Sequence, residues 1–208
     1  VLLLLAVTLP HLDQGDFRTD TARYAAAGLQ AWRDGLFWTP HLHPAVPYFN
    51  KPPLVFWIHG LFLQTFGVSL VVARLPSILA AAGCVLLTVG LVRRFSGRAM
   101  ALGAGCVLAL TYEYFRRTRE VSLDVWQLLF LVGALWVLAV AVQRRRGSIL
   151  AWAGIPCGLA LMCKPLTALL VFPVLAIWLV WTRRAAWLGW LAAALGLALL
   201  VAGPWHVS

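Results

Sequence analysis

Residues 123–146 read LDVWQLLFLVGALWVLAVAVQRRR. Residues 123–142 are almost entirely apolar, and three consecutive arginines follow one residue later. A helix needs about 20 apolar residues to cross the hydrocarbon core of a bilayer. Arginines directly after such a run are typical of its cytoplasmic end. This stretch therefore predicts a transmembrane helix, and with it a membrane protein.

The composition of the whole chain agrees with this prediction. Of its 208 residues, 62% are hydrophobic and only 12% are charged, and the mean hydropathy is +0.86. Soluble domains are roughly 45–50% apolar. The chain has 17 Lys and Arg against 7 Asp and Glu. These basic residues lie between apolar runs, where membrane topology and anionic lipid headgroups explain them, so we expect no nucleic-acid partner.

The apolar runs predict an all-α, polytopic transmembrane bundle. A further apolar run at 54–66 is too short to span, and we expect it to lie in the interface or to extend the helix after it. The chain starts inside one apolar run and stops just after another. Residues 1–208 are therefore interpreted as the N-terminal part of a longer membrane domain, truncated at both ends, with about seven spans. The predicted spans are 1–10, 71–92, 99–112, 123–142, 149–163, 165–182 and 186–203.

The charges sort by membrane face. Three short basic loops, at 93–98, 144–146 and 183–184, contain no acids, and the positive-inside rule places them in the cytoplasm. Alternation then assigns to the opposite face the loop 11–53, residues 113–122, residue 164 and residues 204–208. The acids follow that assignment and gather on the outer face with both lysines: Asp13, Asp16, Asp20, Asp34, Glu113, Glu120, Asp124, Lys51 and Lys164.

Three arginines, Arg116, Arg117 and Arg119, depart from this pattern because they are also assigned to the outer face. One interpretation is local pairing with Glu113 and Glu120. The other is a site for an anionic headgroup or a phosphate.

The outer loop contains good helix formers from Ala22 to Trp32 and then Gly35, which ends a helix well. We predict an amphipathic juxtamembrane helix that lies on the membrane surface. Thr19 or Asp20 could cap this helix. Alternatively, the Asp20 carboxylate acts as a general base or orients an acceptor hydroxyl or amine. Arg23, three residues later, would share its face and could tether the carboxylate or contact a phosphate.

Lys51 precedes Pro52 and Pro53 at the point where the chain re-enters the membrane. Two prolines restrict the backbone there and hold the lysine in place. The sequence leaves open whether Lys51 is a snorkelling lysine at a rigid helix entry or a point charge that binds phosphate.

Asp124 and Lys164 interrupt the ends of apolar runs. Ser122 or Asp124 could simply cap the helix that follows, but an ionisable residue at this position is also a functional candidate. A lysine deep in a bilayer costs roughly 2–3 kcal/mol, which an anionic partner such as a lipid phosphate would offset. The alternative for Lys164 is a hairpin tip in water.

The five histidines, His11, His41, His43, His59 and His206, lack the spacing of a known metal site. His41 and His43 are interpreted as loop residues. His206 is assigned to the outer face, and a metal role for it is left open although no partner is evident.

Five short sequences in this order resemble the membrane-embedded GT-C glycosyltransferases. The similarity is greatest to the bacterial branch that includes lipid A 4-amino-4-deoxy-L-arabinose transferase and the dolichyl-phosphate-mannose-protein mannosyltransferases. No single motif is specific, but their order and the spans between them are, and together they extend over nearly the whole chain. The motifs are Asp20-Thr21-Ala22-Arg23-Tyr24-Ala25, Tyr48-Phe49-Asn50-Lys51-Pro52-Pro53-Leu54, Ala73-Arg74-Leu75-Pro76-Ser77, Ser122-Leu123-Asp124 and Cys163-Lys164-Pro165-Leu166.

The resemblance implies an inverting enzyme that takes a sugar from a polyprenyl-phosphate carrier. The acceptor would be a lipid, a glycan or a protein, at the periplasmic face of the bacterial inner membrane. Asp20 matches the proposed catalytic aspartate of the family's first loop. Lys51 and Lys164 match lysines implicated near the carrier phosphate.

The expected site follows from these matches and from the charge topology. The groups expected to bind the donor and its phosphate are Lys51, Lys164, Arg23, Tyr48, Arg116 and Arg117. The residues expected to support the cavity are Asp124, Asn50 and Glu120.

Two positions depart from the family pattern. Thr21 and Asn50 stand where glutamates are common in the family. Losing both weakens a carboxylate metal site, so the cofactor is left open, with a divalent metal as its one candidate. The loss also makes the sugar and the acceptor less certain than the reaction class.

Two other function classes compete with a transferase. A transporter or flippase of lipid-linked or small solutes would place ionisable groups near the bilayer midplane on broken helices. Here the charges gather at one face, which favours interfacial chemistry. A catalytically inactive assembly subunit is kept open by the missing glutamates.

Overall fold

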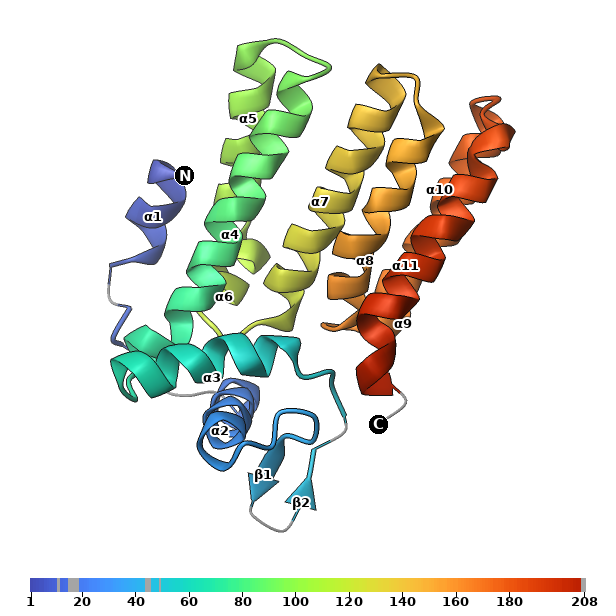
Figure 1. The fold of residues 1–208 in the computed structure, drawn as a ribbon. Helices are drawn as coiled ribbons and strands as arrows, with labels where there is room; N and C mark the ends of the chain where they lie inside the picture. Colours follow the sequence, from blue (N-terminus) through green and yellow to red (C-terminus); the bar gives the residue numbers. More distant parts are fainter. Residues whose placement is uncertain (11, 15–18, 44–45, 49, 207–208) are drawn as a thin grey trace.

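The computed structural model describes residues 1–10, 12–14, 19–43, 46–48 and 50–206, so His11, Asp16 and Phe49 lie outside the described residues. Helices make up most of the chain, which confirms the predicted all-α class (Figure 1). The α-helices are α1 Leu2–Thr8, α2 Thr19–Asp34, α3 Leu54–Phe66, α4 Leu70–Arg93, α5 Arg98–Leu110, α6 Tyr112–Thr118, α7 Leu123–Gln143, α8 Gly154–Leu161, α9 Pro165–Leu169, α10 Val171–Trp181 and α11 Leu188–His206. The 3-10 helices are η1 Gly147–Ala153 and η2 Ala185–Trp187.

Within the described part, three helical stretches are long and apolar enough to cross a membrane: Leu70–Arg93, Leu123–Gln143 and Ala185–Trp205. At 1.5 Å per residue, about 20 residues already reach 30 Å. Four shorter apolar stretches are 54–66, 98–110, 147–161 and 165–181. The run predicted as one span at 165–182 is divided between α9 and α10. Pro173 explains the break, because it has no N–H and its ring excludes the carbonyl group of Leu169.

The arginine loops lie together at one end of the bundle, at the top of Figure 1. Arg145 and Arg183 have φ angles of 51° and 56°, the left-handed conformation in which helices often end. The N–H of Arg146 donates to the carbonyl oxygen of Ala141 at 3.0 Å, and the equivalent bond after α10 runs from Arg184 to Leu179 at 2.7 Å. Both turns are therefore Schellman motifs with arginine at the position that glycine usually occupies.

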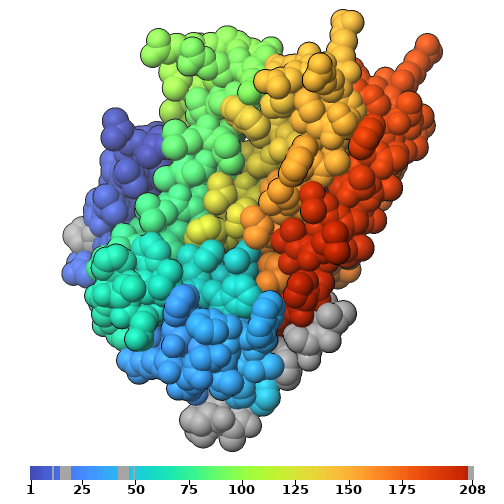
Figure 2. Space-filling model, in the orientation of Figure 1, coloured from blue at the N-terminus to red at the C-terminus, as the bar shows by residue number. Residues whose placement is uncertain are grey.

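The opposite end of the bundle is covered by the first loop. In Figure 1, α3 runs across the ends of the long helices, and α2 lies beneath it. Figure 2 shows the same two helices as a continuous layer, in blue and cyan, below the spans. Gly67, with φ of 88°, separates α3 from α4. Of the two expectations for 54–66, the structure therefore excludes an extension of the next helix.

The amphipathic helix predicted in the first loop is present as α2, and Gly35 ends it with φ of 71°. Its apolar side packs on α3, where Tyr24, Ala25 and Ala31 are buried. The two backbones meet at glycines. A Cβ atom on Gly60 would lie 2.1 Å from the carbonyl oxygen of Gly28, so only glycine permits this approach.

One feature of the loop was not predicted. A short antiparallel ribbon pairs β1 (His41–His43) with β2 (Val46–Pro47), with His41 opposite Pro47. The N–H of Tyr48 then donates to the carbonyl oxygen of Pro40 at 2.7 Å, which closes the ribbon just before the Lys51 motif. His41 and His43 therefore lie on a strand, not in an irregular loop.

Candidate active site

A pocket of about 680 Å³ opens at the end of the bundle opposite the arginine loops. Segments far apart in the sequence contribute to it: α2, the chain before α3, α6, the start of α7 and the turn before α9. Its lining is Asp20, Thr21, Arg23, Tyr24, Lys51, Arg116, Arg117, Glu120, Val121, Ser122, Leu123, Asp124 and Lys164. The structure thus brings most of the predicted site together. Tyr48 and Asn50 are not among the lining residues.

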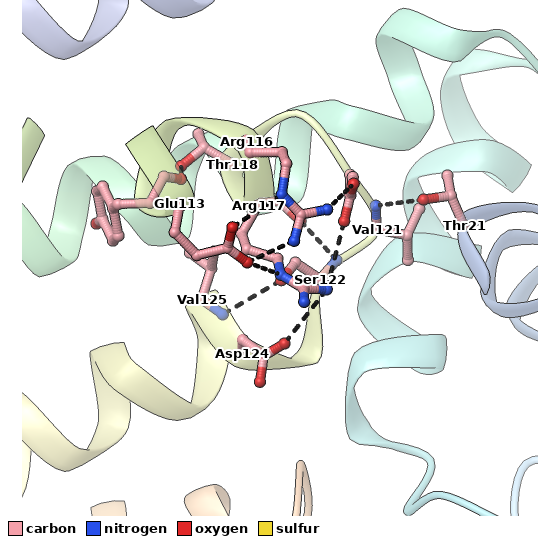
Figure 3. Close-up of polar contacts among 12 residues, drawn as sticks. Thr21, Glu113, Arg116, Arg117, Thr118, Val121, Ser122, Asp124 and Val125 are labelled. Carbon is pink, nitrogen blue, oxygen red and sulfur yellow. Dashed lines mark hydrogen bonds and ion pairs between the residues drawn. The ribbon is translucent and has the colours of Figure 1, made fainter. Parts of the chain in front are cut away.

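The acids and arginines of α6 and of the turn that follows it form a network of ion pairs, shown in Figure 3. Arg117 Nε donates to Glu113 Oε1 at 2.8 Å, and Arg116 Nη1 donates to Glu120 Oε1 at 3.1 Å. Hydrogen bonds from both arginines lower the pKa of Glu113 to about 2. The predicted local pairing of these arginines is confirmed. Both arginines also face the pocket, so pairing and anion binding can coexist.

Asp124 connects this network to α9. Its carboxylate accepts a short hydrogen bond from Lys164 Nζ and lies 3.7 Å from Arg117 Nη1. Gln127, one turn later on α7, donates to the carbonyl oxygen of Lys164 at 3.1 Å and fixes the backbone of that turn. The anionic partner that Lys164 requires is therefore a side chain of this chain.

Capping of α7 leaves Asp124 free for this role. Ser122 is the N-cap, and its hydroxyl accepts a hydrogen bond from the N–H of Val125 at 3.4 Å. Of the two residues proposed as caps, the structure selects Ser122.

The capping hypothesis for Asp20 is wrong, because α2 already includes Thr19. Asp20 lies in the first turn of the helix, where the macrodipole favours a negative charge. Its side chain is 71% exposed and lies 3.7 Å from Arg23 Nη1, which confirms the predicted tether. Burial, together with the charges of Tyr48 and Asp20, raises the pKa of Tyr24 to about 12. Tyr24 therefore presents a neutral hydroxyl close to Asp20.

Lys51 enters the pocket from the chain before α3. Pro52 and Pro53 behind it are buried, and Pro53 is the N-cap of α3. The predicted rigid helix entry is therefore present. Among the described residues, no carboxylate lies within ion-pair distance of Lys51. Within the described part of the chain, a ligand could therefore reach Lys51 without breaking an ion pair.

The charges of the lining favour an anionic ligand. Asp20, Glu120 and Asp124 are outnumbered by five cations, namely Arg23, Lys51, Arg116, Arg117 and Lys164. An apolar pocket of about 290 Å³ adjoins the charged one and shares Arg117 and Asp124 with it. Its other lining residues are Leu108, Thr111, Glu113, Tyr114, Val125 and Leu128. A ligand with a charged end and a hydrocarbon chain matches this combination.

A family model described as dolichyl-phosphate-mannose-protein mannosyltransferase matches residues 50–207. The chain belongs to this family. Among its curated relatives are undecaprenyl phosphate-alpha-4-amino-4-deoxy-L-arabinose arabinosyl transferases. The one from Erwinia tasmaniensis is 30% identical over 92% of this chain and 36% of its own length. The one from Pseudomonas aeruginosa strain LESB58 is 33% identical over the whole chain and 40% of its own length.

Two solved structures share the fold of this mannosyltransferase-family chain. The crystal structure of ArnT from Cupriavidus metallidurans bound to undecaprenyl phosphate superposes with a TM-score of 0.83 at 22% identity, and it covers 99% of this chain and 40% of that one. The crystal structure of the same ArnT in the apo state superposes with a TM-score of 0.76, also at 22% identity. It covers 99% of this chain and 41% of that one. The predicted GT-C fold is confirmed. The chain spans about 40% of the length of the relatives it matches.

Several residues that line the pocket were not predicted from the sequence as site residues. Thr21 Oγ1 accepts a hydrogen bond from the N–H of Val121 at 3.4 Å and ties α2 to the segment before α7. Tyr24 was named only as part of the Asp20–Ala25 motif and was given no role. Its place one turn after Asp20 on the same helix was the available signal.

The described residues of the lining do not offer the ligand cluster of a metal centre. No group of three or more His, Cys, Asp or Glu side chains gathers to hold a metal ion in the part of the chain that the structure describes. The carboxylates of Asp20, Glu120 and Asp124 instead face arginine or lysine nitrogens. The side chain of His206, one of the predicted outer-face histidines, lies outside the described set.

Proposed function

We propose that this chain is the N-terminal part of an integral-membrane glycosyltransferase. The enzyme moves a sugar from a polyprenyl-phosphate carrier to a lipid, glycan or protein acceptor. One observation carries the proposal. The exposed Asp20 carboxylate lines the same pocket as Lys51, Lys164 and the arginines of α6, at the end of the bundle opposite the arginine loops. The names of the relatives support the same reaction class.

The proposed topology places the arginine loops in the cytoplasm and the pocket at the periplasmic face of a bacterial inner membrane. It rests on the separation of charge between the two ends of the bundle, which the positive-inside rule orients. The domain assignment, about seven spans with residues 11–53 as a periplasmic loop, belongs to the same proposal.

The reaction is a displacement at the anomeric carbon. A nucleophilic atom of the acceptor forms the new bond to that carbon while the bond to the carrier phosphate oxygen breaks, with inversion. The bonding electron pair leaves with the phosphate, which gains one negative charge. Asp20 takes the proton of the acceptor, or orients the acceptor where the nucleophile carries no proton.

Lys51 and Lys164 hold the phosphate in this proposal and stabilise the charge that develops on it. The two lysines start from different states. Lys51 has no acidic partner among the described residues, whereas Lys164 is already oriented by Asp124. The polyprenyl chain fits the adjoining apolar pocket, where its first isoprene units would pack between α5, α6 and α7.

The test uses the full-length protein in membranes supplied with a radiolabelled polyprenyl-phosphate sugar. We expect release of the label to an acceptor, and loss of that release in Asp20→Asn at normal expression. Label that crosses the membrane without transfer would indicate a transporter, and neither event would indicate an assembly subunit. Full transfer by Asp20→Asn would exclude the catalytic role of Asp20.

A further inference from the structure

A buried histidine lies behind the pocket, on α3, and does not line it. His59 is completely buried, and it forms polar contacts with α4 and α7. His59 Nδ1 lies 2.8 Å from the carbonyl oxygen of Ala73, and His59 Nε2 lies 3.4 Å from Ser77 Oγ. We call the set of His59, Ala73, Ser77, Ser122 and Trp126 the His59 network.

The donors in this network determine where the proton of His59 lies. Trp126 Nε1 can only donate, and it lies 3.3 Å from His59 Nε2. Nε2 is therefore the acceptor, and the proton is on Nδ1, from which it is donated to Ala73. The hydroxyl of Ser77 accepts from the N–H of Ser122 at 3.2 Å. Because Nε2 carries no proton, Ser77 Oγ, 3.4 Å away, is the donor in its contact with Nε2 and shares the one lone pair of that nitrogen with Trp126. Burial lowers the pKa of His59 to about 4, which agrees with a neutral ring.

The His59 network forms hydrogen bonds with the start of α7 on both sides of Asp124. It holds the backbone of Ser122, two residues before Asp124, and the indole of Trp126, two residues after it. Asp124 itself lines the pocket and reaches Lys164 and Arg117. The rotation and height of this turn therefore depend on contacts made on the side away from the pocket.

The same histidine is rigidly connected to Lys51. It lies in the second turn of α3, which begins at Leu54 directly after Pro52 and Pro53. A shift of α3 against α7 would change the separation between Lys51 and the Asp124–Lys164 pair. Lys51 and Lys164 are the two cations that the proposed function places around one phosphate.

We propose that His59 is a positioning residue that sets the spacing between Lys51 and the Asp124–Lys164 pair through Ser77, Ser122 and Trp126. This inference rests on the proposed function. Displacements of about 1 Å in a reacting site can lower rates about 100-fold. Loss of the Nε2 acceptor is therefore expected to lower kcat/KM for sugar transfer by more than a loss of fold stability alone would explain.

The experiment compares three variants of the full-length enzyme in lipid nanodiscs, with the radiolabelled polyprenyl-phosphate sugar as substrate. His59→Leu removes both hydrogen-bonding atoms. His59→Gln keeps an acceptor near the Nε2 position. Leu63→Ala, one turn later on α3 and 3% exposed, is the matched control because it loses packing but no polar contact. Rates are expressed per folded protein, and melting temperatures are measured in parallel.

We expect His59→Leu to lower kcat/KM for the donor about 10- to 100-fold. His59→Gln should recover most of the loss, and Leu63→Ala should melt earlier with unchanged kcat/KM. Ser77→Ala, a smaller change that is safer for folding, should reproduce the loss in part. Nitrogen-15 spectra of labelled histidine should show a neutral ring with the proton on Nδ1, in a signal that His59→Gln removes.

Unchanged kinetics in both His59→Leu and Ser77→Ala would overturn the inference. So would equal losses in His59→Leu and Leu63→Ala, because these would indicate stability alone. A wild-type enzyme that transfers no sugar would overturn the proposed function, and the inference with it. If the wild type transfers sugar and His59→Leu has an unchanged kcat/KM, only the inference about His59 would be overturned.

Discussion

The pair between Asp124 and Lys164 offers a quantitative test of how the pocket is held together. Asp124→Asn and Lys164→Met each remove one charge of the pair, and the double variant removes both. Two unit charges 4 Å apart attract by about 4 kcal/mol at an effective dielectric constant of 20. These side chains are 39% and 30% exposed, so water screens the attraction. We therefore expect a coupling of about 1–2 kcal/mol, between that of an exposed pair and that of a hydrogen bond to a buried charge.

The measurement is a double-mutant cycle on the unfolding free energy of the full-length protein in detergent micelles. Each single variant should unfold at lower denaturant, and the double variant should lose about 1–2 kcal/mol less than the sum of the two. Glu113→Gln is the control, because it breaks an exposed pair on α6 that does not involve Lys164. Coupling below about 0.3 kcal/mol, the ordinary error of additivity, would refute the pairing as a structural element.

The same variants separate structure from chemistry. If Lys164 holds the carrier phosphate, Lys164→Met should reduce sugar transfer strongly, whereas Asp124→Asn keeps the cation and should reduce transfer less. Equal or greater loss in Asp124→Asn would contradict the proposed role of Lys164.

Four further results are expected. Lys51→Met should raise the donor KM about 10- to 100-fold in steady-state kinetics, since a hydrogen bond to a charged group contributes about 1.5–3 kcal/mol; an unchanged KM would exclude a phosphate contact. Gly60→Ala should lower the unfolding free energy by about 1–3 kcal/mol, because its Cβ would lie 2.1 Å from a backbone oxygen, whereas Gly103→Ala, with open space around it, should not. The pKa of Glu113 is lowered from 4.5 to about 2, so its ion pairs stabilise the fold above pH 4.5 and lose that effect as the pH falls toward 2; Glu113→Gln should flatten this part of the curve of melting temperature against pH. Arg145→Gly should stabilise the protein by about 1 kcal/mol in denaturant unfolding, because φ is 51° there, and a loss of stability would argue against strain at this turn.

The helices, and the end of the bundle at which each charged loop lies, could be predicted from the sequence because their causes are local. An apolar run long enough to span, such as 123–142, is visible in the chain itself, and so are the arginine loops that follow such runs. The separation of charge between the two ends then needs only the alternation of spans. The break at Pro173 was also visible in the chain, since proline removes a helical donor. It was missed because the hydropathy of 165–182 is continuous.

The contacts within the pocket depend on which helix ends meet, and no local pattern states that. Asp124 and Lys164 are 40 residues apart, and both were predicted on the same face. Their pairing requires the start of α7 to lie against the turn before α9, which depends on the packing of the bundle. The prediction therefore identified Asp124 and Lys164 as site residues, but it proposed a lipid phosphate, not Asp124, as the anionic partner of Lys164. The packing of α2 on α3 through Gly28 and Gly60 was missed for the same reason.

Pairing also separates the acids of the pocket into two kinds, which bears on which of them performs chemistry. Asp124 accepts a hydrogen bond from Lys164, and Glu120 accepts one from Arg116, so a proton gained by either would weaken a contact that shapes the wall. Asp20 is 71% exposed and 3.7 Å from Arg23, too far for a strong hydrogen bond. It can take up a proton without loosening the contacts between α6, α7 and α9. We infer that the more exposed and more weakly paired carboxylate is the one that works on the acceptor, whereas the tightly paired carboxylates keep the cations at a fixed distance from it.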